Sequence, residues 1–219
     1  MKHKILSLFA AVVILFSCNS ETKDTKTEGG DTNTTASSDK KEEPWVSVDS
    51  ATMMKNMMEY GTPGPMHEML ASWSGTWNGE STIWEYEGAT PQKSTGTAVS
   101  NMIMGGKYQS STHSGNMMGM PFEGMSIMGY DNAAKQFTST WVDNWSTGIM
   151  AMAGQWDAAS KTLTMTGKMP DINRPGKECS YKEVFKVIDD NNQVMEMYGP
   201  DPKTGKEFKM MEMKMTRKK

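Results

Sequence analysis

Short stretches of alternating apolar and polar residues, separated by turn-forming residues, recur from about residue 73 to the end of the chain. The clearest two are Phe122–Tyr130 and Gln136–Val142, joined by Asp131-Asn132-Ala133-Ala134. A run that alternates residue by residue and then reaches an Asp-Asn turn is typical of a β-hairpin. A further Asp-Asn turn at Asp143-Asn144 follows directly, so the chain is predicted to meander from one antiparallel strand to the next.

Ten such segments can be counted, separated by Gly, Asn, Asp and Pro residues that favour turns. They lie near residues 73–87, 95–104, 106–114, 121–130, 135–142, 146–155, 160–169, 178–188, 193–199 and 206–216. Short, evenly spaced strands without helical periodicity between them indicate an all-β antiparallel fold. Because an open sheet would leave two exposed edges, we predict a single up-and-down β-barrel over residues 72–218. A barrel of about ten strands is wide enough to hold a cavity.

A helical periodicity precedes the strands. In Trp45–Tyr60 four methionines recur at helical spacing, and Gly61 stands where such a helix would end. Met66–Ala71 favours a second short helix. Residues 45–71 are therefore predicted to form a helical lid or plug of one or two short helices.

The first 17 residues have the pattern of an export signal. Two lysines precede an apolar run from Ile5 to Phe16, which is too short to span a bilayer as a stable helix. Leu15-Phe16-Ser17-Cys18 resembles the bacterial lipoprotein signal, in which the Cys is acylated after cleavage. Residues 1–17 are thus predicted to be a lipoprotein signal peptide, and Cys18 to carry the lipid that anchors the protein to a membrane.

Residues 18–44 are predicted to form a flexible linker. They are rich in Thr, Ser, Asp, Glu, Lys and Gly and contain no large apolar residue, so they cannot bury enough surface to offset their ordering entropy. Asn19 follows Cys18, where an Asp would favour retention in the inner membrane of well-studied lipoproteins. The expected location is the bacterial cell envelope, at the outer membrane and facing the periplasm.

Charge and cysteine content restrict the partners further. Removal of Lys2 and Lys4 with the signal reduces the 23 basic residues to 21, against 26 acidic ones, for a formal charge of −5. The largest basic cluster is Arg217-Lys218-Lys219, so nucleic acid is not an expected partner. With Cys18 acylated, Cys179 has no cysteine partner in the mature chain, and no intramolecular disulfide is expected.

Several motifs in order are similar to those of one family. Leu70-Ala71-Ser72-Trp73-Ser74-Gly75-Thr76-Trp77 resembles the opening L-x-G-x-W of lipocalin-like barrels. The motifs that follow are Gly105-Gly106-Lys107-Tyr108, Met118-Gly119-Met120-Pro121-Phe122-Glu123-Gly124, Gly129-Tyr130-Asp131, Trp141-Val142-Asp143, Gly154-Gln155-Trp156-Asp157, Gly205-Lys206-Glu207-Phe208 and Thr216-Arg217-Lys218. The set covers about residues 65 to 218 and resembles the DUF1579 family of uncharacterised bacterial proteins. The resemblance implies a calycin-like β-barrel and no agreed activity.

The same comparison bears on haem. Nitrobindin-like barrels, a possible relative, carry haem on a His from a late strand. The histidines here are His3, His67 and His113, and none follows residue 113. Haem is therefore not expected, and the main functional hypothesis includes no cofactor.

Methionine is the most unusual part of the composition, with 24 residues. Many stand two apart, as in Met102/Met104, Met118/Met120, Met150/Met152, Met195/Met197 and Met211/Met213/Met215. Residues two apart in a strand face the same side, so these methionines are predicted to fill the core or line a cavity for a pliable apolar ligand. Clustered thioethers are also suitable ligands for Cu(I), which leaves a soft-metal site as the alternative. The residues of that alternative site are Met53, Met57, Met66 and His67.

No sequence motif predicts catalysis, because G-x-S-x-G, H-E-x-x-H and C-x-x-C are all absent. The first functional hypothesis is a lipoprotein whose barrel binds a small hydrophobic or amphipathic molecule. The residues predicted to contact that ligand are Trp84, His113, Phe122, Trp141, Met150, Met152, Met195 and Met197. A Cu(I)-binding protein is the second hypothesis. An enzyme acting on an envelope lipid, with His113 and an Asp as acid and base, is the third.

Overall fold

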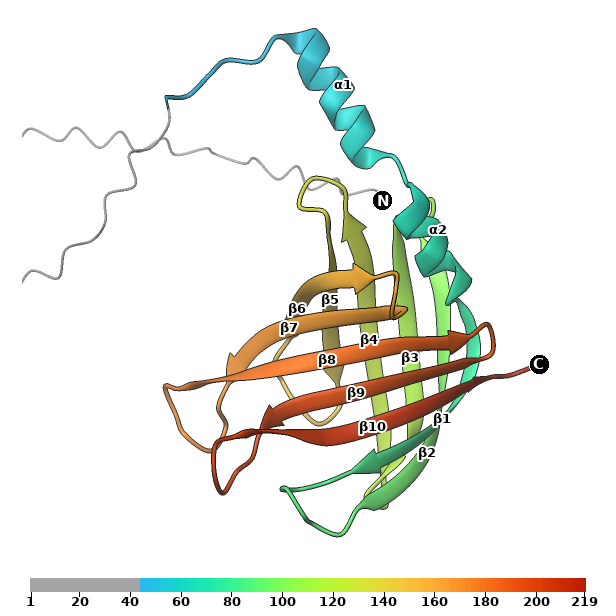
Figure 1. Cartoon of the computed structure of the whole chain (residues 1–219), viewed down its shortest axis with the longest axis vertical. Coiled ribbons are helices and arrows are strands. Elements are labelled where there is room, and N and C mark those ends of the chain that lie inside the picture. The colour runs from blue at the N-terminus through green and yellow to red at the C-terminus, as the bar shows by residue number, and fades with distance from the viewer. Residues whose placement is uncertain (1–43) are drawn as a thin grey trace, which may run out of the picture. The chain divides into compact units, whose positions relative to one another are not determined.

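The computed structural model describes residues 44–219, of which residues 47–219 form one compact unit. Pro44, Trp45 and Val46 belong to the preceding part of the chain and are exposed, without helix or strand. The predicted signal peptide, Cys18 and nearly all of the predicted linker lie outside the described residues. The compact unit consists of two short helices followed by ten strands (Figure 1).

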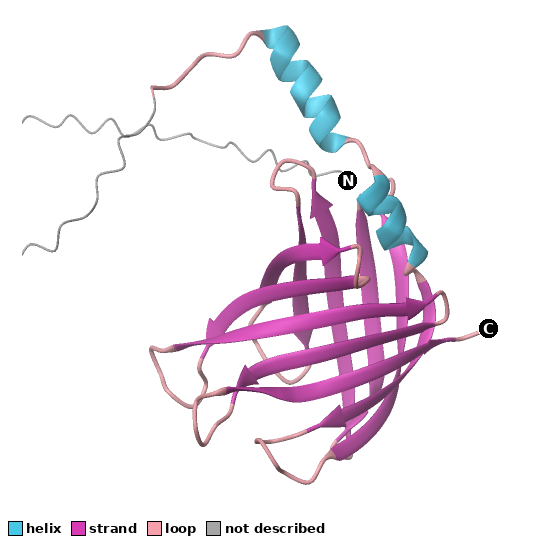
Figure 2. Cartoon of the chain, in the orientation of Figure 1, coloured by secondary structure: helices cyan, strands magenta, loops and turns pink. Residues whose placement is uncertain are grey.

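The strands form a closed antiparallel barrel in which each strand pairs with its neighbours in the sequence (Figure 2). They are β1 (Gly75–Ile83), β2 (Gln92–Ile103), β3 (Tyr108–Met117), β4 (Met120–Asp131), β5 (Gln136–Asp143), β6 (Met150–Asp157), β7 (Thr162–Pro170), β8 (Glu178–Asp189), β9 (Asn192–Pro200) and β10 (Glu207–Arg217). β1 also pairs with β10, from Trp77 opposite Arg217 to Ile83 opposite Met211. This last pairing closes the sheet and confirms the predicted ten-stranded up-and-down barrel.

The first strand is shorter than the stretch 73–87 expected from the sequence. Trp73 is the C-cap of helix α2 (Pro65–Ser72) and has a helical backbone, with φ −84° and ψ −6°. Gly75 then turns the chain into β1 with φ 134°, a conformation that favours glycine. A Cβ at Gly75 would also lie 2.6 Å from the guanidinium of Arg217. The helix therefore continues to the barrel wall, and β1 begins only after this turn.

The two predicted helices are present. α1 (Ser50–Gly61) begins after Asp49, whose carboxyl group accepts hydrogen bonds at 3.0 Å from backbone N–H groups of the first turn. α1 has no buried residue, but the side-chain amide of Asn132 donates to the carbonyl oxygens of Tyr60 and Thr62 at 3.0 and 2.9 Å. The end of α1 is thus held at the turn between β4 and β5. Among the described residues, no helix has both the length and the apolar composition to cross a membrane.

Apolar side chains from α2 and its C-cap fill one end of the barrel. Leu70 and Trp73 are buried in a cluster with strand residues. The Trp73 ring centroid lies 5.0 Å from that of Phe185 and 6.3 Å from that of Phe137. The Gln109 side chain donates to the carbonyl oxygen of Leu70 at 2.9 Å, which satisfies a carbonyl at the end of the helix. This end of the barrel is therefore closed.

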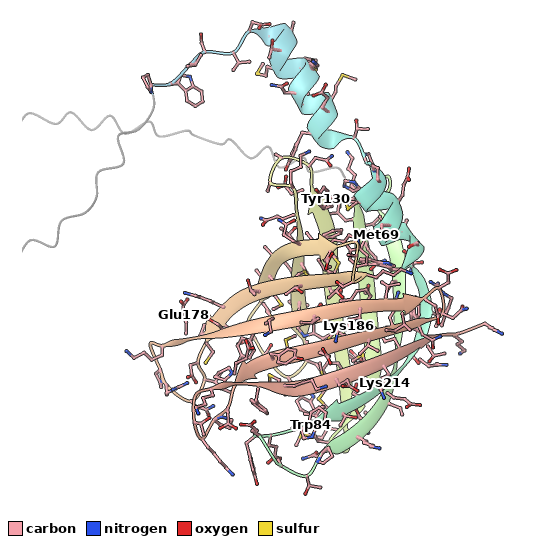
Figure 3. All side chains as sticks on the ribbon, viewed as in Figure 1. Met69, Trp84, Tyr130, Glu178, Lys186 and Lys214 are labelled. Carbon is pink, nitrogen blue, oxygen red and sulfur yellow. The ribbon has the colours of Figure 1, made fainter. Side chains whose placement is uncertain are left out.

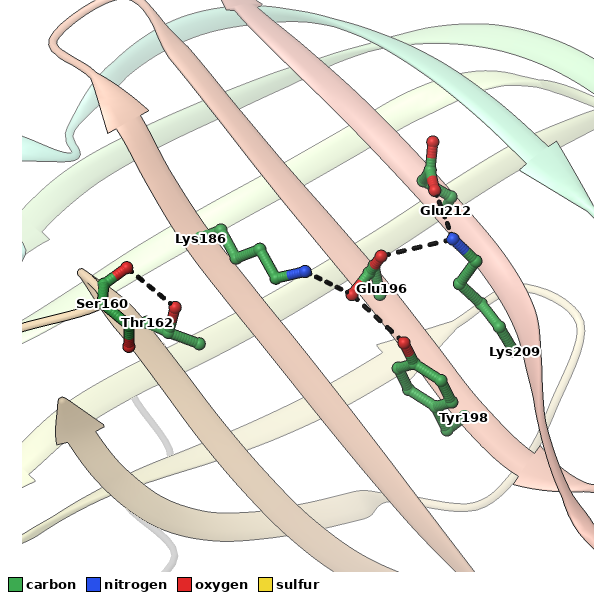
Figure 4. A network of polar contacts seen from close by, with 7 residues as sticks. All are labelled: Ser160, Thr162, Lys186, Glu196, Tyr198, Lys209 and Glu212. Carbon is green, nitrogen blue, oxygen red and sulfur yellow. Dashed lines mark hydrogen bonds and ion pairs between the residues drawn. The ribbon is translucent and has the colours of Figure 1, made fainter.

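The outer face of β8, β9 and β10 carries a network of charged side chains (Figure 4). The carboxyl group of Glu196 on β9 accepts from Lys186 Nζ at 2.8 Å and Lys209 Nζ at 3.2 Å. The Tyr198 hydroxyl group donates to the same carboxyl group at 3.2 Å, and Lys209 also pairs with Glu212. Burial alone would raise the pKa of Glu196, but the two lysines outweigh this effect and lower it. The Glu196 carboxyl group thus has its charged and hydrogen-bonding partners on the outer face of the barrel itself.

Candidate ligand-binding site

The barrel encloses a cavity of about 430 Å³ to which all ten strands contribute side chains. Trp73 and Trp77 line it at the end closed by α2. Phe122, Trp145 and Met169 line it toward the opposite end, where the β3–β4, β5–β6 and β7–β8 connections lie. The volume falls within the roughly 300–1,000 Å³ typical of small-molecule sites.

Small hydroxyl side chains from β1 to β5 make up one part of the lining. They are Ser81, Ser94, Ser100, Ser111, Ser126 and Ser139. The strand register places Ser81 opposite Ser94 and Ser111 opposite Ser126. The hydroxyl oxygens of Ser100 and Ser111 are 2.7 Å apart, within hydrogen-bond distance. A hydroxyl-bearing surface therefore follows the first half of the barrel wall.

Thioether side chains dominate the lining from β6 to β10. They are Met150, Met152, Met169, Met195, Met197, Met211, Met213 and Met215. On β9 and β10 the register places Met195 opposite Met213 and Met197 opposite Met211. Directly opposed residues on one face have Cβ atoms about 5 Å apart, so these side chains form a contiguous apolar surface. Methionine is flexible, and such a surface can adapt to ligands of different shape.

His113 lies on β3, within the hydroxyl-bearing part of the lining, and contacts aromatic rings. Its ring centroid is 5.0 Å from that of Trp141, edge to face, and the Trp141 ring is stacked with Phe122 at 6.2 Å. Gly124, opposite His113 in the ladder, makes room for this arrangement, because a Cβ there would lie 2.4 Å from the Trp141 ring. Burial lowers the pKa of His113 to about 4, so the imidazole is neutral at pH 7.

Asp143 lines the cavity near the β5–β6 connection but serves mainly to hold that turn. Its carboxyl group accepts from Trp141 Nε1 at 2.8 Å and from the backbone N–H groups of Trp145 and Ser146 at 2.9 Å. Burial would raise the pKa of Asp143, but these hydrogen bonds outweigh it and lower the pKa. Within the described residues no hydrogen bond joins His113 to Asp143 or to another acid. The acid–base pair of the enzyme hypothesis is therefore not assembled in this structure.

Glu183 on β8 also lines the cavity and was not singled out from the sequence. It lies opposite Met165 on β7 and Met197 on β9. In the part of the chain that the structure describes, its carboxyl group has no hydrogen bond or ion pair, and burial raises its pKa to about 7. The available signal was parity, because Glu183 shares a strand face with the aromatic residues Tyr181 and Phe185.

Comparison with known families matches residues 62–217 to the model described as "Protein of unknown function (DUF1579)". This range includes α2 and the whole barrel. The chain belongs to the DUF1579 family. The family predicted from the ordered motifs is thus confirmed, and the cavity lies within the matched region.

Among solved structures, this DUF1579 protein is similar to Rv2717c from M. tuberculosis, with a TM-score of 0.53 and 10% sequence identity. The aligned region covers 72% of this chain and 100% of the other. At this identity the likeness shows the fold alone. A comparison with curated proteins gives no match.

Seven of the eight residues predicted to contact a ligand line the cavity of this DUF1579 barrel, from β3, β4, β5, β6 and β9. They are His113, Phe122, Trp141, Met150, Met152, Met195 and Met197. Trp84 is not part of the lining. It follows the last residue of β1, and Lys209 Nζ lies 5.8 Å from the centroid of its ring. Figure 3 shows Trp84 at the end of the barrel away from α2.

The four residues of the alternative metal site are divided between the two helices of the DUF1579 protein. Met53 and Met57 lie on α1 and are exposed. Met66 and His67 lie on α2, where Met66 packs against the core and His67 Nδ1 accepts from the backbone N–H of Gly64 at 3.0 Å. Within residues 44–219 no group of three or more His, Cys, Asp or Glu side chains could hold a metal ion.

Proposed function

We propose that this DUF1579 protein is a cell-envelope lipoprotein that binds a small hydrophobic or amphipathic molecule inside its barrel. The observation that carries this proposal is the cavity of about 430 Å³, lined by thioethers on one part and by aromatic and hydroxyl groups on the other. Transfer of an apolar chain from water into such a space is favourable by about 25 cal/mol per Å² of buried surface. The envelope location rests on the sequence of residues 1–18.

The lining supports binding rather than catalysis as the main role. Methionine side chains change rotamer easily, so they can contact ligands that differ in length or branching. The serine hydroxyl groups supply hydrogen-bond donors and acceptors that can orient a polar head. Such a mixture of a large apolar surface and a few polar groups is the usual composition of small-molecule sites.

Binding of 1-decanol tests the proposal with a neutral amphipathic probe. Trp77, Trp141 and Trp145 line the cavity, so occupancy should change their fluorescence, and native mass spectrometry should show the bound mass. Saturable one-to-one binding is the expected result. The absence of any saturable change with 1-decanol, together with a clean unliganded mass, would count against a carrier function.

Filling the cavity supplies the matched control. A Cβ at Gly79 would lie 3.5 Å from Met213 Sδ, an ordinary contact, so Gly79→Leu can place its side chain in the cavity from a backbone position that accepts a Cβ. Asn78→Leu adds a similar side chain at an exposed position of the same strand. We expect Gly79→Leu to weaken 1-decanol binding by about tenfold or more and Asn78→Leu to leave it unchanged. Equal binding by both variants would place the ligand outside the cavity.

A second candidate function, Cu(I) binding, gains support from the paired methionines of β9 and β10. Met195 lies opposite Met213, and Met197 lies opposite Met211, so four thioethers occupy adjacent positions on one face. Thioethers are ligands that select Cu(I) over harder cations. Native mass spectrometry with Cu(I) tests this candidate, and the Met195→Leu/Met213→Leu double variant should lose the bound metal. Retention of Cu(I) by that variant would exclude this site.

A further inference from the structure

We propose that the ligand of this cavity carries a protonated amine on an apolar chain, and that the carboxyl group of Glu183 binds that amine. The inference rests on the proposed cavity binding and adds the chemical class of the ligand. It starts from the position of Glu183 inside the methionine-lined half of the barrel.

The surroundings of Glu183 offer its carboxyl group almost no compensation. Its cross-strand neighbours are Met165 and Met197, and its neighbours on the same face of β8 are Tyr181 and Phe185. An ionised carboxylate in such surroundings is unfavourable unless a cation or several hydrogen-bond donors reach it. The protein supplies neither within the described residues.

The cations nearest in sequence are directed to the other side of the wall. Lys182 pairs with Glu207 and lies over the Tyr198 ring, at 4.5 Å from its centroid. Lys186 donates to Glu196 at 2.8 Å. Because successive side chains of a strand point to opposite faces, neither lysine can turn inward without leaving its partner.

The ionisable groups that face the cavity are all acids or neutral bases. Among the described lining residues these are His113, Asp143 and Glu183, and no Lys or Arg is present. The inward residues of β7 and β9 next to Glu183 carry no titratable group, and Tyr181 is the titratable neighbour on β8. A ligand carboxylate or phosphate would meet an acid without a compensating cation, whereas an ammonium would meet an unpaired acceptor.

Binding of an ammonium displaces a proton from Glu183 when that carboxyl group is protonated beforehand. Burial raises the pKa of Glu183 to about 7, whereas an alkylammonium, like the Lys side chain, has a pKa of about 10.4. Below pH 7 the Glu183 proton leaves for solvent as the ion pair forms, and charge is conserved. Affinity for the amine should therefore fall by about tenfold per pH unit below 7 and stay constant from pH 7 to 9.

The test compares three probes with the same chain length on the full protein: 1-aminodecane, 1-decanol and decanoate. At pH 8 we expect the amine to bind at least about tenfold more tightly than the alcohol, and decanoate to bind most weakly. Titration calorimetry at pH 6 in two buffers of different ionisation enthalpy should show release of nearly one proton per amine bound. The alcohol should release none.

Glu183→Gln keeps the size and a hydrogen-bond acceptor but removes the charge. This variant should lose the preference for the amine over 1-decanol and release no proton on binding. The matched control is Glu212→Gln, a glutamate in the outer charge network of β10, which should keep the amine preference.

The outcomes separate the two proposals. Failure of the wild type to bind 1-decanol or the amine would overturn the carrier function and this inference with it. Binding of 1-decanol without an amine preference would leave the carrier function standing and show that the amine inference is wrong. Retention of the amine preference by Glu183→Gln would overturn the role of Glu183.

Discussion

Glu183 and Glu196 lie on adjacent strands of one barrel wall, yet their surroundings are opposite. Glu196 on the outer face receives Lys186, Lys209 and the Tyr198 hydroxyl group within 3.2 Å. Glu183 faces the cavity between methionines and receives no partner within the described residues. The pKa of Glu196 is lowered despite its burial, whereas burial raises that of Glu183 to about 7.

The comparison shows that the presence of partners, and not burial alone, decides the charge of a wall carboxylate in this barrel. Both carboxyl groups are partly desolvated, which disfavours the ionised form. At Glu196 the two lysines reverse that effect. On the inner face, where lysines are absent from the described lining, the effect remains. The Glu196 carboxyl group on the outer face is thus paired with two lysines, whereas that of Glu183 on the inner face has no charged partner among the described residues.

The largest expected effect is that of Glu183 on the pH dependence of the free energy of unfolding. The pKa of Glu183 in the folded state is raised to about 7, so the folded protein binds an extra proton between about pH 4.5 and 7 and loses stability as pH rises through this range. Glu183→Gln removes that loss. At pH 8 we expect the variant to be more stable than the wild type by about 2–3 kcal/mol, and at pH 4.5 to be equal to it.

Denaturant unfolding at both pH values measures this difference. The control is Glu212→Gln, which should not gain stability between pH 4.5 and 8. A Glu183→Gln variant with the same gain or loss at both pH values would show that the Glu183 carboxyl group titrates normally, and the contrast with Glu196 would disappear.

His113 should change the pH dependence of stability in the opposite direction and by a slightly smaller amount. Burial lowers its pKa to about 4, so the folded protein binds fewer protons than the unfolded chain between about pH 4 and 6.5 and loses stability as pH falls through that window. His113→Gln removes this loss and should stabilise the protein by about 2 kcal/mol at pH 5 relative to its effect at pH 8.

The two inner groups should therefore oppose each other between pH 4.5 and 6.5, and the wild type should show a shallow pH dependence there. Glu183→Gln should make stability rise with pH in this range, and His113→Gln should make it fall. Thermal unfolding across the range measures both slopes. Parallel curves for the wild type and both variants would contradict this account of the cavity.

On the outer face, Glu196→Gln should lower stability at pH 7 by about 1–2 kcal/mol, because it removes a charged acceptor from two lysines. The folded pKa of Glu196 is lowered, so its contribution is present above the unfolded pKa and is lost as pH falls through the folded pKa. The cost of the substitution should accordingly shrink in acid. The affinity for 1-decanol should not change. A lower affinity would mean that the two faces of the wall are coupled.

The ten strands could be predicted from the sequence, but the inward position of Glu183 could not. Alternation and turn residues predicted the ten strands, because both depend on local chemistry. The start of β1 was wrong, since Trp73 follows α2 into the core instead of joining the sheet, and that choice depends on tertiary packing with Phe137 and Phe185. Glu183 was overlooked because a charged strand residue is ordinarily exposed.

The placement of the predicted ligand residues has the same physical origin. Met150 and Met195 reach the cavity because alternation fixes which neighbours share their face, and the large apolar side chains select the inner face. Trp84 does not, because Trp77, Gly79 and Ser81 line the cavity from β1, and alternation directs a residue of the opposite parity away from it. Periodicity thus groups the residues of a strand by face, but the sequence alone did not show which face of β1 is the inner one.

The smallest effect should come from Lys214 on the outer face of β10, labelled in Figure 3. Lys214 Nζ lies 3.8 Å from Glu212, and its side chain is 68% exposed, so the pair is screened by solvent. Lys214→Gln should change the free energy of unfolding by less than about 0.5 kcal/mol, and 1 M salt should abolish even that change. Chemical denaturation at low and high salt measures it, with Glu196→Gln as the reference for a residue within the network. A loss as large as that of Glu196→Gln would extend the network through Glu212 to the barrel surface, and the outer face would then depend on long-range charge rather than on the contacts of Glu196 alone.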